Sequence, residues 1–249
     1  MISPESRANL VSKEHCGPNS PHQIDKPFMT QKWRDAIFIN WPVPAAAVDR
    51  VIPNGLEPDL FNGTAWVSLV PFRMENLRIR HLPPIPGTSN FGEVNVRTYV
   101  RGPNGPGVWF CSLDVHAALA TLVARTFYRL PYCHGEVSET QAATTSNWKV
   151  KRKRPEVVAG ELEIEKLSTP VNDLLSVFLT ARWRLYSGRS KKLRVAQVDH
   201  PPWDLSEAKI KKCTAGLVDH AGFDVSEATP TAYWSPGVPV RVTAPKLTR

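Results

Sequence analysis

The stretch from Cys111 to Glu136 reads CSLDVHAALATLVARTFYRLPYCHGE, and our expectation for the fold starts from it. Ser112 and Asp114 are residue types that begin helices, because their side-chain oxygens accept hydrogen bonds from free backbone N–H groups. Pro131 ends a helix, since it lacks an N–H and pushes Leu130 toward extended geometry. Between these limits, apolar residues recur in steps of three and four: Val115, Ala118, Leu119, Leu122, Val123 and Phe127. The spacing predicts a helix with one apolar face that leads into a strand.

The densest group of reactive side chains follows Pro131 directly: Tyr132, Cys133, His134 and Glu136. A helix that delivers such a group to a new strand is one way to place catalytic residues, and a helix exit without a chemical role is the alternative. Cys133 and His134 are neighbours, so in a strand they point to opposite faces, which is a poor geometry for a Cys–His nucleophile pair. His116 or His200 could serve instead, although nothing in the sequence pairs them.

Alternating strands surround this stretch. The clearest is 91–101, FGEVNVRTYVR, in which every second residue is polar or aromatic: Glu93, Asn95, Arg97 and Tyr99. These four side chains share one strand face, which either faces water or lines a polar cavity. Further strands are expected at 36–39, 64–74, 108–111, 136–139, 146–153, 161–167, 191–198, 209–213 and 238–242, with short helices at 44–52 and after Thr169.

Length and composition favour one β-rich domain. The chain has 249 residues, of which 42% are hydrophobic, and its 23 prolines argue against a bundle of long helices. Residues 1–26 have no apolar period, so we expect a poorly ordered tail before a single domain at 27–249. Many strands with two or three helices predict a mainly β (α+β) fold, an antiparallel barrel or sandwich-like domain rather than alternating βαβ units.

Charge, cysteines and motifs limit the classes of function. The net charge is +8, with basic residues gathered at 149–154, 191–194 and 209–212; we interpret these as solvated strand faces, and nucleic-acid binding as the less favoured alternative. No apolar run approaches the roughly 20 residues that span a membrane, and the N-terminus has no secretory pattern. The four cysteines form no CxxC, which predicts reduced thiols in the cytoplasm. Because GxGxxG, P-loop, HExxH and GxSxG motifs are absent, we predict no cofactor and no metal.

Several segments together resemble the uncharacterised YqjF-like family of bacterial proteins. These segments span about residues 30 to 245 in family order: NWPVP at 40–44, WVSLVPF at 66–72, EVNVRTYV at 93–100, FCSLD at 110–114, ARTFYRLPY at 124–132, LTARWRLY at 179–186, HPPW at 200–203 and WSPGV at 234–238. The resemblance implies the fold of the acetoacetate-decarboxylase-like superfamily, a cone-shaped, mainly antiparallel β-barrel with a few helices and an internal cavity. It implies no activity, because the family has none firmly assigned.

The superfamily comparison also concerns individual residues. Acetoacetate decarboxylases carry a segment similar to WGxPKK, whose first lysine forms a Schiff base with a β-keto acid while the second lowers the pKa of the first. The matching stretch here is YRLPYC at 128–133, so Tyr132 stands at the Schiff-base position and Cys133 beside it. Neither side chain is an amine. The pocket glutamate of those enzymes, in a YxE pattern, matches Glu93 in Phe91–Glu93.

We therefore expect a barrel that binds or processes a small anionic organic molecule without Schiff-base chemistry. Glu93 would act as acid or base, and Tyr132 would donate a hydrogen bond. Arg97 or Arg182 would hold the anion, and Asn95, Tyr186 and His134 complete the candidate ligand-binding residues. The alternatives are a ligand-binding or interaction protein without catalysis, and a decarboxylase that uses another lysine such as Lys149. The sequence leaves open whether the protein is an enzyme and whether it is a homo-oligomer.

Overall fold

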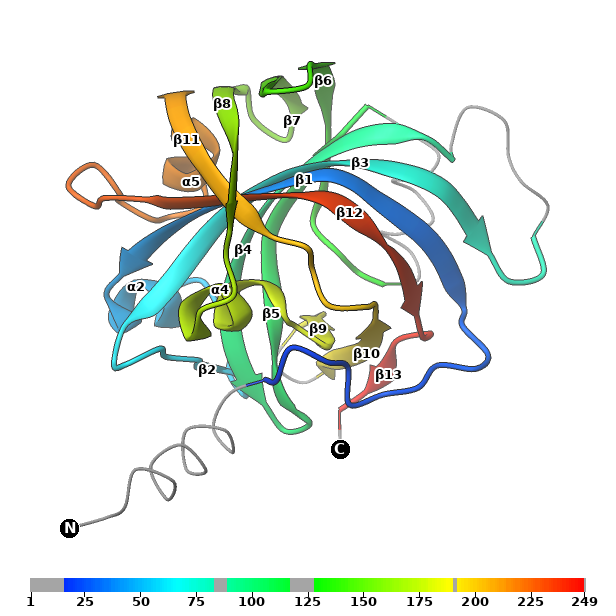
Figure 1. The fold of residues 1–249 in the computed structure, drawn as a ribbon. Helices are drawn as coiled ribbons and strands as arrows, with labels where there is room; N and C mark the ends of the chain where they lie inside the picture. The colour runs from blue at the N-terminus through cyan, green and yellow to red at the C-terminus, as the bar shows by residue number, and fades with distance from the viewer. Residues whose placement is uncertain (1–15, 83–88, 117–127, 190–191, 249) are drawn as a thin grey trace, which may run out of the picture.

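One large sheet dominates the fold of the computed structural model (Figure 1), which describes residues 16–82, 89–116, 128–189 and 192–248. The sheet has 13 strands: β1 (Met29–Val43), β2 (Glu57–Pro58), β3 (Ala65–Ile79), β4 (Phe91–Gly102), β5 (Gly105–Val115), β6 (Tyr132–Gln141), β7 (Thr145–Arg154), β8 (Val158–Pro170), β9 (Arg184–Ser187), β10 (Arg194–Asp199), β11 (Ser206–Cys213), β12 (Thr231–Val242) and β13 (Lys246–Leu247). Three short helices are described: α2 (Ala45–Asp49), α4 (Leu174–Thr180) and α5 (Gly216–His220).

The strand pairings close the sheet on itself. From β5 the order runs through β6, β7, β8, β11, β12, β1, β3 and β4, and β4 pairs with β5 again. A shorter path joins β12 to β5 through β10 and β9. Neighbouring strands are antiparallel except for β5–β6 and β5–β9, which are parallel. The predicted mainly β, largely antiparallel fold is thus confirmed, and the two parallel pairings are additions that the sequence did not indicate.

The shared wall of β1, β3 and β4 buries both of its faces. Side chains alternate along a strand, so each of these strands serves two apolar clusters. The first core takes residues that include Phe38, Phe72, Met74, Tyr99, Leu113, Val115 and Tyr132. The second core takes residues that include Ile37, Ile39, Leu69, Val94, Val96, Trp148 and Leu162. The polar row of β4 lies on the face of the first core.

Helix α4 covers part of the first core. Asp173 caps its start, because the Asp173 side chain accepts a hydrogen bond of 2.7 Å from the Ser176 N–H. Near the other end of α4, the Leu179 carbonyl accepts hydrogen bonds from Arg97 Nη2 at 3.0 Å and from the Tyr99 hydroxyl at 2.8 Å. These bonds fix α4 against β4 and consume donors from the polar row.

The predicted helix start at Ser112 and Asp114 is wrong, because both residues lie inside β5. The Asp114 carboxylate accepts two hydrogen bonds from Arg152 of β7, at 2.6 and 2.7 Å, and Ser112 donates to the same carboxylate. Sheet pairing with β4 and this buried ion pair outweigh the local capping preference. The apolar positions expected from Ala118 to Phe127 lie outside the described residues.

The domain begins earlier than the predicted boundary at residue 27. The described residues 16–28, before β1, form no helix or strand, yet Ile24 is only 5% exposed. Trp183 Nε1 also donates a hydrogen bond of 3.1 Å to the Gly17 carbonyl. The described residues 16–26 therefore pack on the sheet rather than forming part of a tail, and residues 1–15 lie outside the described chain.

The basic runs of β7 and β11 are matched by glutamates of neighbouring strands. Lys149 and Lys212 both reach Glu161, and Lys211 reaches Glu165 at 2.6 Å. Such cross-strand pairs belong to a solvated sheet face, in agreement with our interpretation of the basic runs except at Arg152 of β7, which is only 2% exposed. None of the four cysteines, which all lie in the described part of the chain, forms a disulfide, and no described helix is both long and apolar enough to cross a membrane.

Candidate functional site

The structure brings Glu93 and Tyr132 together in the first core. Glu93 lies on β4 and is 2% exposed, and Tyr132 opens β6 and is 9% exposed. The Tyr132 hydroxyl donates a hydrogen bond of 3.0 Å to Glu93 Oε2. Strand β5 lies between them, because Val115 pairs with Glu93 and Leu113 pairs with Tyr132. The two residues are far apart in sequence, and the closed sheet makes them neighbours.

The environment of this pair keeps Glu93 close to its ionisation point at neutral pH. Burial raises the pKa of Glu93 from 4.5 to about 7, and hydrogen bonds from Tyr132 and Asn95 oppose that rise. The nearby Asp114 charge adds to the rise. Burial and the Glu93 carboxylate also raise the pKa of Tyr132 well above its ordinary value. Tyr132 is therefore a neutral hydrogen-bond donor.

The polar row of β4 continues with Asn95 and Arg97, which are 3% and 7% exposed. The row thus faces the interior and not water. Asn95 Oδ1 and Arg97 Nε have no hydrogen-bond partner among the described residues, although buried polar atoms are nearly always satisfied. The Arg97 guanidinium lies 5.5 Å from the Phe38 ring centroid, and no described carboxylate forms an ion pair with it. The Asn95 Oδ1 acceptor and the Arg97 guanidinium are therefore available to a ligand in the interior.

Arg182 is the less suitable of the two candidate anion-binding arginines. Its Nη1 lies 2.5 Å from Asp59 Oδ2, and Arg101 contacts the other oxygen of the same carboxylate at 2.8 Å. The Arg182 guanidinium also packs 4.0 Å from the Phe178 ring centroid. It therefore shares one carboxylate with Arg101, and its position is fixed within the fold, although its Nη2 has no hydrogen-bond partner among the described residues.

Tyr186 lies at the other end of β5 from Glu93. It pairs with Trp109, whereas Glu93 pairs with Val115, and six residues along a strand span about 20 Å. The Tyr186 hydroxyl donates to the Gly105 carbonyl at 2.7 Å. The structure therefore does not bring Tyr186 to Glu93.

The candidate histidines contact other groups. His134 is half-buried, and its ring centroid lies 6.1 Å from that of His116; its Nδ1 has no partner in the described part of the chain. His200 packs 4.5 Å from the Trp183 ring centroid, and burial lowers its pKa to about 4, so it is neutral. Cys133 is buried on the strand face opposite Tyr132. No pairing of these histidines with Cys133 is observed among the described residues.

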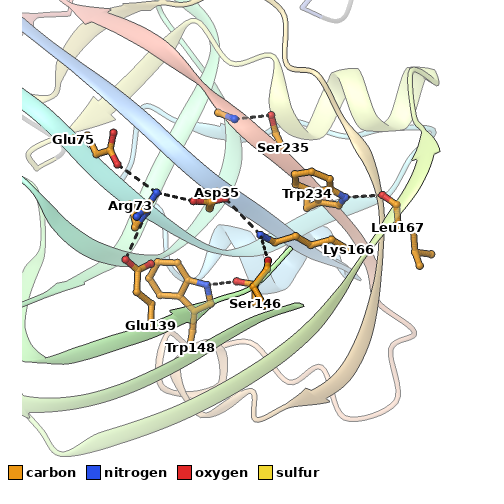
Figure 2. Close-up of polar contacts among 12 residues, drawn as sticks. Asp35, Arg73, Glu75, Glu139, Ser146, Trp148, Lys166, Leu167, Trp234 and Ser235 are labelled. Atoms are coloured by element: carbon orange, nitrogen blue, oxygen red, sulfur yellow. Dashed lines mark hydrogen bonds and ion pairs between the residues drawn. The ribbon is translucent and has the colours of Figure 1, made fainter. Parts of the chain in front are cut away.

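Lys149, the alternative Schiff-base lysine, lies on the solvated face of the sheet. Its side chain is 72% exposed and its Nζ lies 3.6 Å from Glu161. Lys166 is the more buried lysine, with a side chain that is 7% exposed. Figure 2 shows its Nζ reaching toward Asp35, at 3.5 Å, and the same atom lies 5.4 Å from the Trp234 ring centroid.

Lys166 belongs to a charged cluster that sequence reasoning missed. Figure 2 shows Arg73 at its centre, in contact with three carboxylates: Asp35 at 2.9 Å, Glu75 at 3.4 Å and Glu139 at 3.7 Å. Asp35 occupies an irregular position of β1 with a φ of 48°. That backbone conformation turns Asp35 toward Arg73 and Lys166, and nothing in the local sequence indicated it. Opposite charges satisfy one another here, which is the pattern of a structural network.

The buried Asp114–Arg152 pair is a second feature without a sequence signal. The two side chains are 0% and 2% exposed, and they come from β5 and β7. The Asp114 side chain points to the opposite face of β5 from the first core, and its charge helps to raise the pKa of Glu93. Within the described chain, no group of three or more His, Cys, Asp or Glu residues is arranged to hold a metal.

Comparisons with known proteins agree with this architecture. The chain is 39% identical over 178 residues to the uncharacterized protein YqjF of Bacillus subtilis (strain 168), which covers 70% of this chain and 74% of that protein. Among solved structures, the enduracididine biosynthesis enzyme MppR complexed with pyruvate matches with a TM-score of 0.62 at 12% identity, covering 92% of this chain and 93% of that one. Acetoacetate decarboxylase from Legionella pneumophila matches with a TM-score of 0.62 at 10% identity, covering 96% and 95%.

The structural matches establish the fold alone, because their sequence identities are low. That fold is acetoacetate-decarboxylase-like, as the resemblance implied. The profile of the family described as DUF2071, uncharacterized conserved protein, matches residues 30–239. The chain therefore belongs to the DUF2071 family of uncharacterized conserved proteins.

Proposed function

We propose that this protein binds a small organic acid inside the closed sheet and moves a proton on it, with Glu93 as general acid or base. The observation that carries the proposal is the buried hydrogen bond of 3.0 Å between Tyr132 and Glu93. A carboxyl with a pKa of about 7 can both give and take a proton near neutral pH, which general acid–base catalysis requires. Tyr132 would hold the carboxylate in place and donate to a substrate oxygen.

Arg97 would hold the acidic group of the substrate. It is buried, and its Nε has no partner in the described part of the chain. A guanidinium pairs well with a carboxylate, and the attraction is stronger where water is excluded. Asn95, between Glu93 and Arg97 on the same strand face, would contribute its unpartnered Oδ1 to a donor on the ligand.

The proposed chemistry uses no Schiff base. Tyrosine cannot form an imine, and Tyr132 stands where the superfamily comparison places the lysine. Lys149 faces solvent, and the Lys166 ammonium is paired with Asp35. The pyruvate named for MppR and the acetoacetate of the decarboxylases are ligands of those proteins; here they suggest only that a short organic acid is a reasonable first probe.

A binding protein without catalysis is the second candidate. The same unpartnered atoms, Asn95 Oδ1 and Arg97 Nε, would serve recognition as well as they serve chemistry. The two candidates differ in one respect. Catalysis needs the proton of Glu93, whereas recognition needs only the charge and shape of the interior.

A thermal-shift screen of short organic acids, followed by NMR detection of product, tests the proposal. We expect an acid that raises the melting temperature and is converted. Glu93→Gln should keep most of the thermal shift and lose about 100-fold or more in turnover. Tyr132→Phe should also lose turnover. Tyr186→Phe is the matched control, because it removes a buried hydroxyl that bonds a carbonyl outside the site.

Arg97→Gln should abolish the ligand-dependent thermal shift, while Arg34→Gln, which removes a half-exposed arginine paired with Glu75, should not. Undiminished turnover in Glu93→Gln would contradict the catalytic role. A shift that depends on Arg97, with no conversion by the native protein, would establish the binding protein instead.

A further inference from the structure

A pocket of about 490 Å³ lies against β5, β6 and β7, next to the Glu93–Tyr132 pair. Its lining includes Ser112 of β5, Cys133 of β6 and Arg152 of β7. Ser112 and Cys133 each alternate with a residue of the first core, so they point to the opposite side of the sheet. The volume is typical of a small-molecule site. Leu130 and Tyr132 of the first core also line it, so the pocket borders the interior where the polar row of β4 lies.

The pocket exists because the sheet forks along β5. Strand β9 pairs with β5 through Val108 and Trp109 only, and β6 pairs from Leu113 onward. Between these points, no described strand pairs with residues 110–112 on this side. A stretch of strand edge is left open, and the pocket lies against it.

The charge of the pocket is positive. Arg129, Arg152 and His220 are among the lining residues, and no Asp or Glu is. Arg152 is 2% exposed and donates from Nε and Nη2 to Asp114. Its Nη1 donates no hydrogen bond to any described residue. Ser187 also lines the pocket, and its buried hydroxyl has no partner among the described residues. An anionic group would satisfy these donors.

The remaining wall is apolar and partly aromatic. Trp109, Phe110 and Tyr186 contribute to it, together with Leu130 and Pro131. Flat apolar surfaces of this kind favour a ligand with a ring. The pocket therefore combines one anchored guanidinium with an aromatic wall.

We propose that this pocket is a second binding site, which takes an aromatic monocarboxylate. The carboxylate lies against Arg152 Nη1 and Arg129, and the ring lies against Trp109 and Tyr186. The site borders the proposed organic-acid site at Tyr132 but differs in its anchoring residues, since it uses neither Glu93 nor Arg97.

Calorimetric titration with 1-naphthoate, and with 1-naphthamide as its uncharged counterpart, tests this site. Because a charge-assisted hydrogen bond is lost in the amide, 1-naphthoate should bind about tenfold more tightly or better. Ala221→Trp, at a lining residue, should fill the pocket and weaken 1-naphthoate binding at least about tenfold. Ala143→Trp, at an exposed position outside the pocket, is the matched control and should leave binding unchanged.

Two further variants distinguish binding in this pocket from binding in the interior. Arg129→Gln, an exposed substitution that spares the core, should weaken 1-naphthoate and leave 1-naphthamide unchanged. Arg97→Gln should leave both unchanged, because Arg97 belongs to the interior. Equal binding of acid and amide, no saturable binding up to about 1 mM, or full binding in Ala221→Trp would each overturn the second site. Loss in Arg97→Gln with full binding in Ala221→Trp would place the ligand in the interior and also overturn it, whatever the outcome for turnover at Glu93.

Discussion

Glu93 shows how one side chain takes its properties from its surroundings. Its carboxyl has the same chemistry as that of Glu165 on the exposed face of β8, yet their pKa values move in opposite directions. Lys211 lowers the pKa of Glu165, whereas burial raises that of Glu93. Tyr132 limits the rise by donating to the carboxylate. The pKa of Glu93 is therefore set mainly by desolvation, whereas that of Glu165 is set by a nearby cation.

The raised pKa of Glu93 predicts a dependence of stability on pH. In the unfolded chain Glu93 ionises near 4.5, and in the folded protein near 7. Between these values the folded state holds a proton that the unfolded state has lost, so the free energy of unfolding falls as pH rises through the window and is constant above it. Relative to Glu93→Gln, the native protein should lose about 3 kcal/mol between pH 4.5 and pH 8.

Urea unfolding of the native protein and Glu93→Gln at both pH values measures this difference. Glu165→Gln is the control, and its difference from the native protein should not fall in this window, since that pKa is lowered. A constant difference between the native protein and Glu93→Gln across the window would show that Glu93 ionises normally in the fold.

At the residue scale, the sequence predicted which sheet face a side chain occupies better than which residue that side chain contacts. Alternation along 91–101 placed Glu93, Asn95 and Arg97 on one face, and all three are buried there. It could not distinguish Arg97 from Arg182 as the anion-binding residue. The partner that holds Arg182 in place is Asp59, which is remote in sequence, and only the closed sheet brings the two together.

Individual strands also depend on close backbone contact. Gly237 of β12 has a φ of 113° and faces Arg34 of β1, and a Cβ at this position would overlap the Trp33 carbonyl oxygen. Gly55 has a φ of 96° but lies in open space. An alanine at either position would carry the backbone cost of a left-handed conformation, and only at position 237 would its Cβ clash as well.

Gly237→Ala should therefore lower the free energy of unfolding by about 3 kcal/mol or more, because β1 and β12 must separate locally. Gly55→Ala should cost only about 1–2 kcal/mol, the price of the left-handed conformation. Chemical denaturation compares the two, and equal losses would mean that β12 accommodates the methyl group without moving.

At the scale of elements, periodicity was reliable where it was long, whereas capping residues were reliable at Asp173 of α4 and misleading at Ser112. The strand expected at 91–101 is β4. The strand expected at 36–39 is the middle of β1, which runs from Met29 to Val43. The helix start expected at Ser112 is wrong, because Ser112 and Asp114 belong to β5 and Asp114 pairs with Arg152. A residue such as Asp114 can cap a helix or form a buried ion pair, and the local sequence does not distinguish these two roles.

On the scale of the whole molecule, the lysines of the described residues lie away from the Glu93–Tyr132 pair. Those of β7 and β11 face solvent among glutamates, and Lys166 is tied to Asp35. We therefore expect no imine: incubation with acetoacetate and sodium borohydride should leave the intact mass unchanged. A reduced adduct would contradict this, and Lys166→Met and Lys149→Met would then show which lysine reacted.

The closure of the sheet could not be predicted from periodicity, because alternation identifies strands but not their neighbours. The pairings of β4 with β5, β5 with β6 and β1 with β12 decide which side chains meet. The order of segments in the family resemblance carried that information instead. Where the resemblance concerned one residue, as at Tyr132, it indicated a position without indicating its partner.

The pairing of β1 with β12 also bears on how the protein is made. Met29 lies opposite Val242, so one side of β1 has no partner until almost the whole chain has left the ribosome. A nascent chain must hold β1, β3 and β4 as an open sheet whose edge remains unsatisfied for most of translation. Exposed strand edges invite association between chains. The yield of this protein should thus depend on translation speed and chaperone supply as well as on the stability of its finished fold.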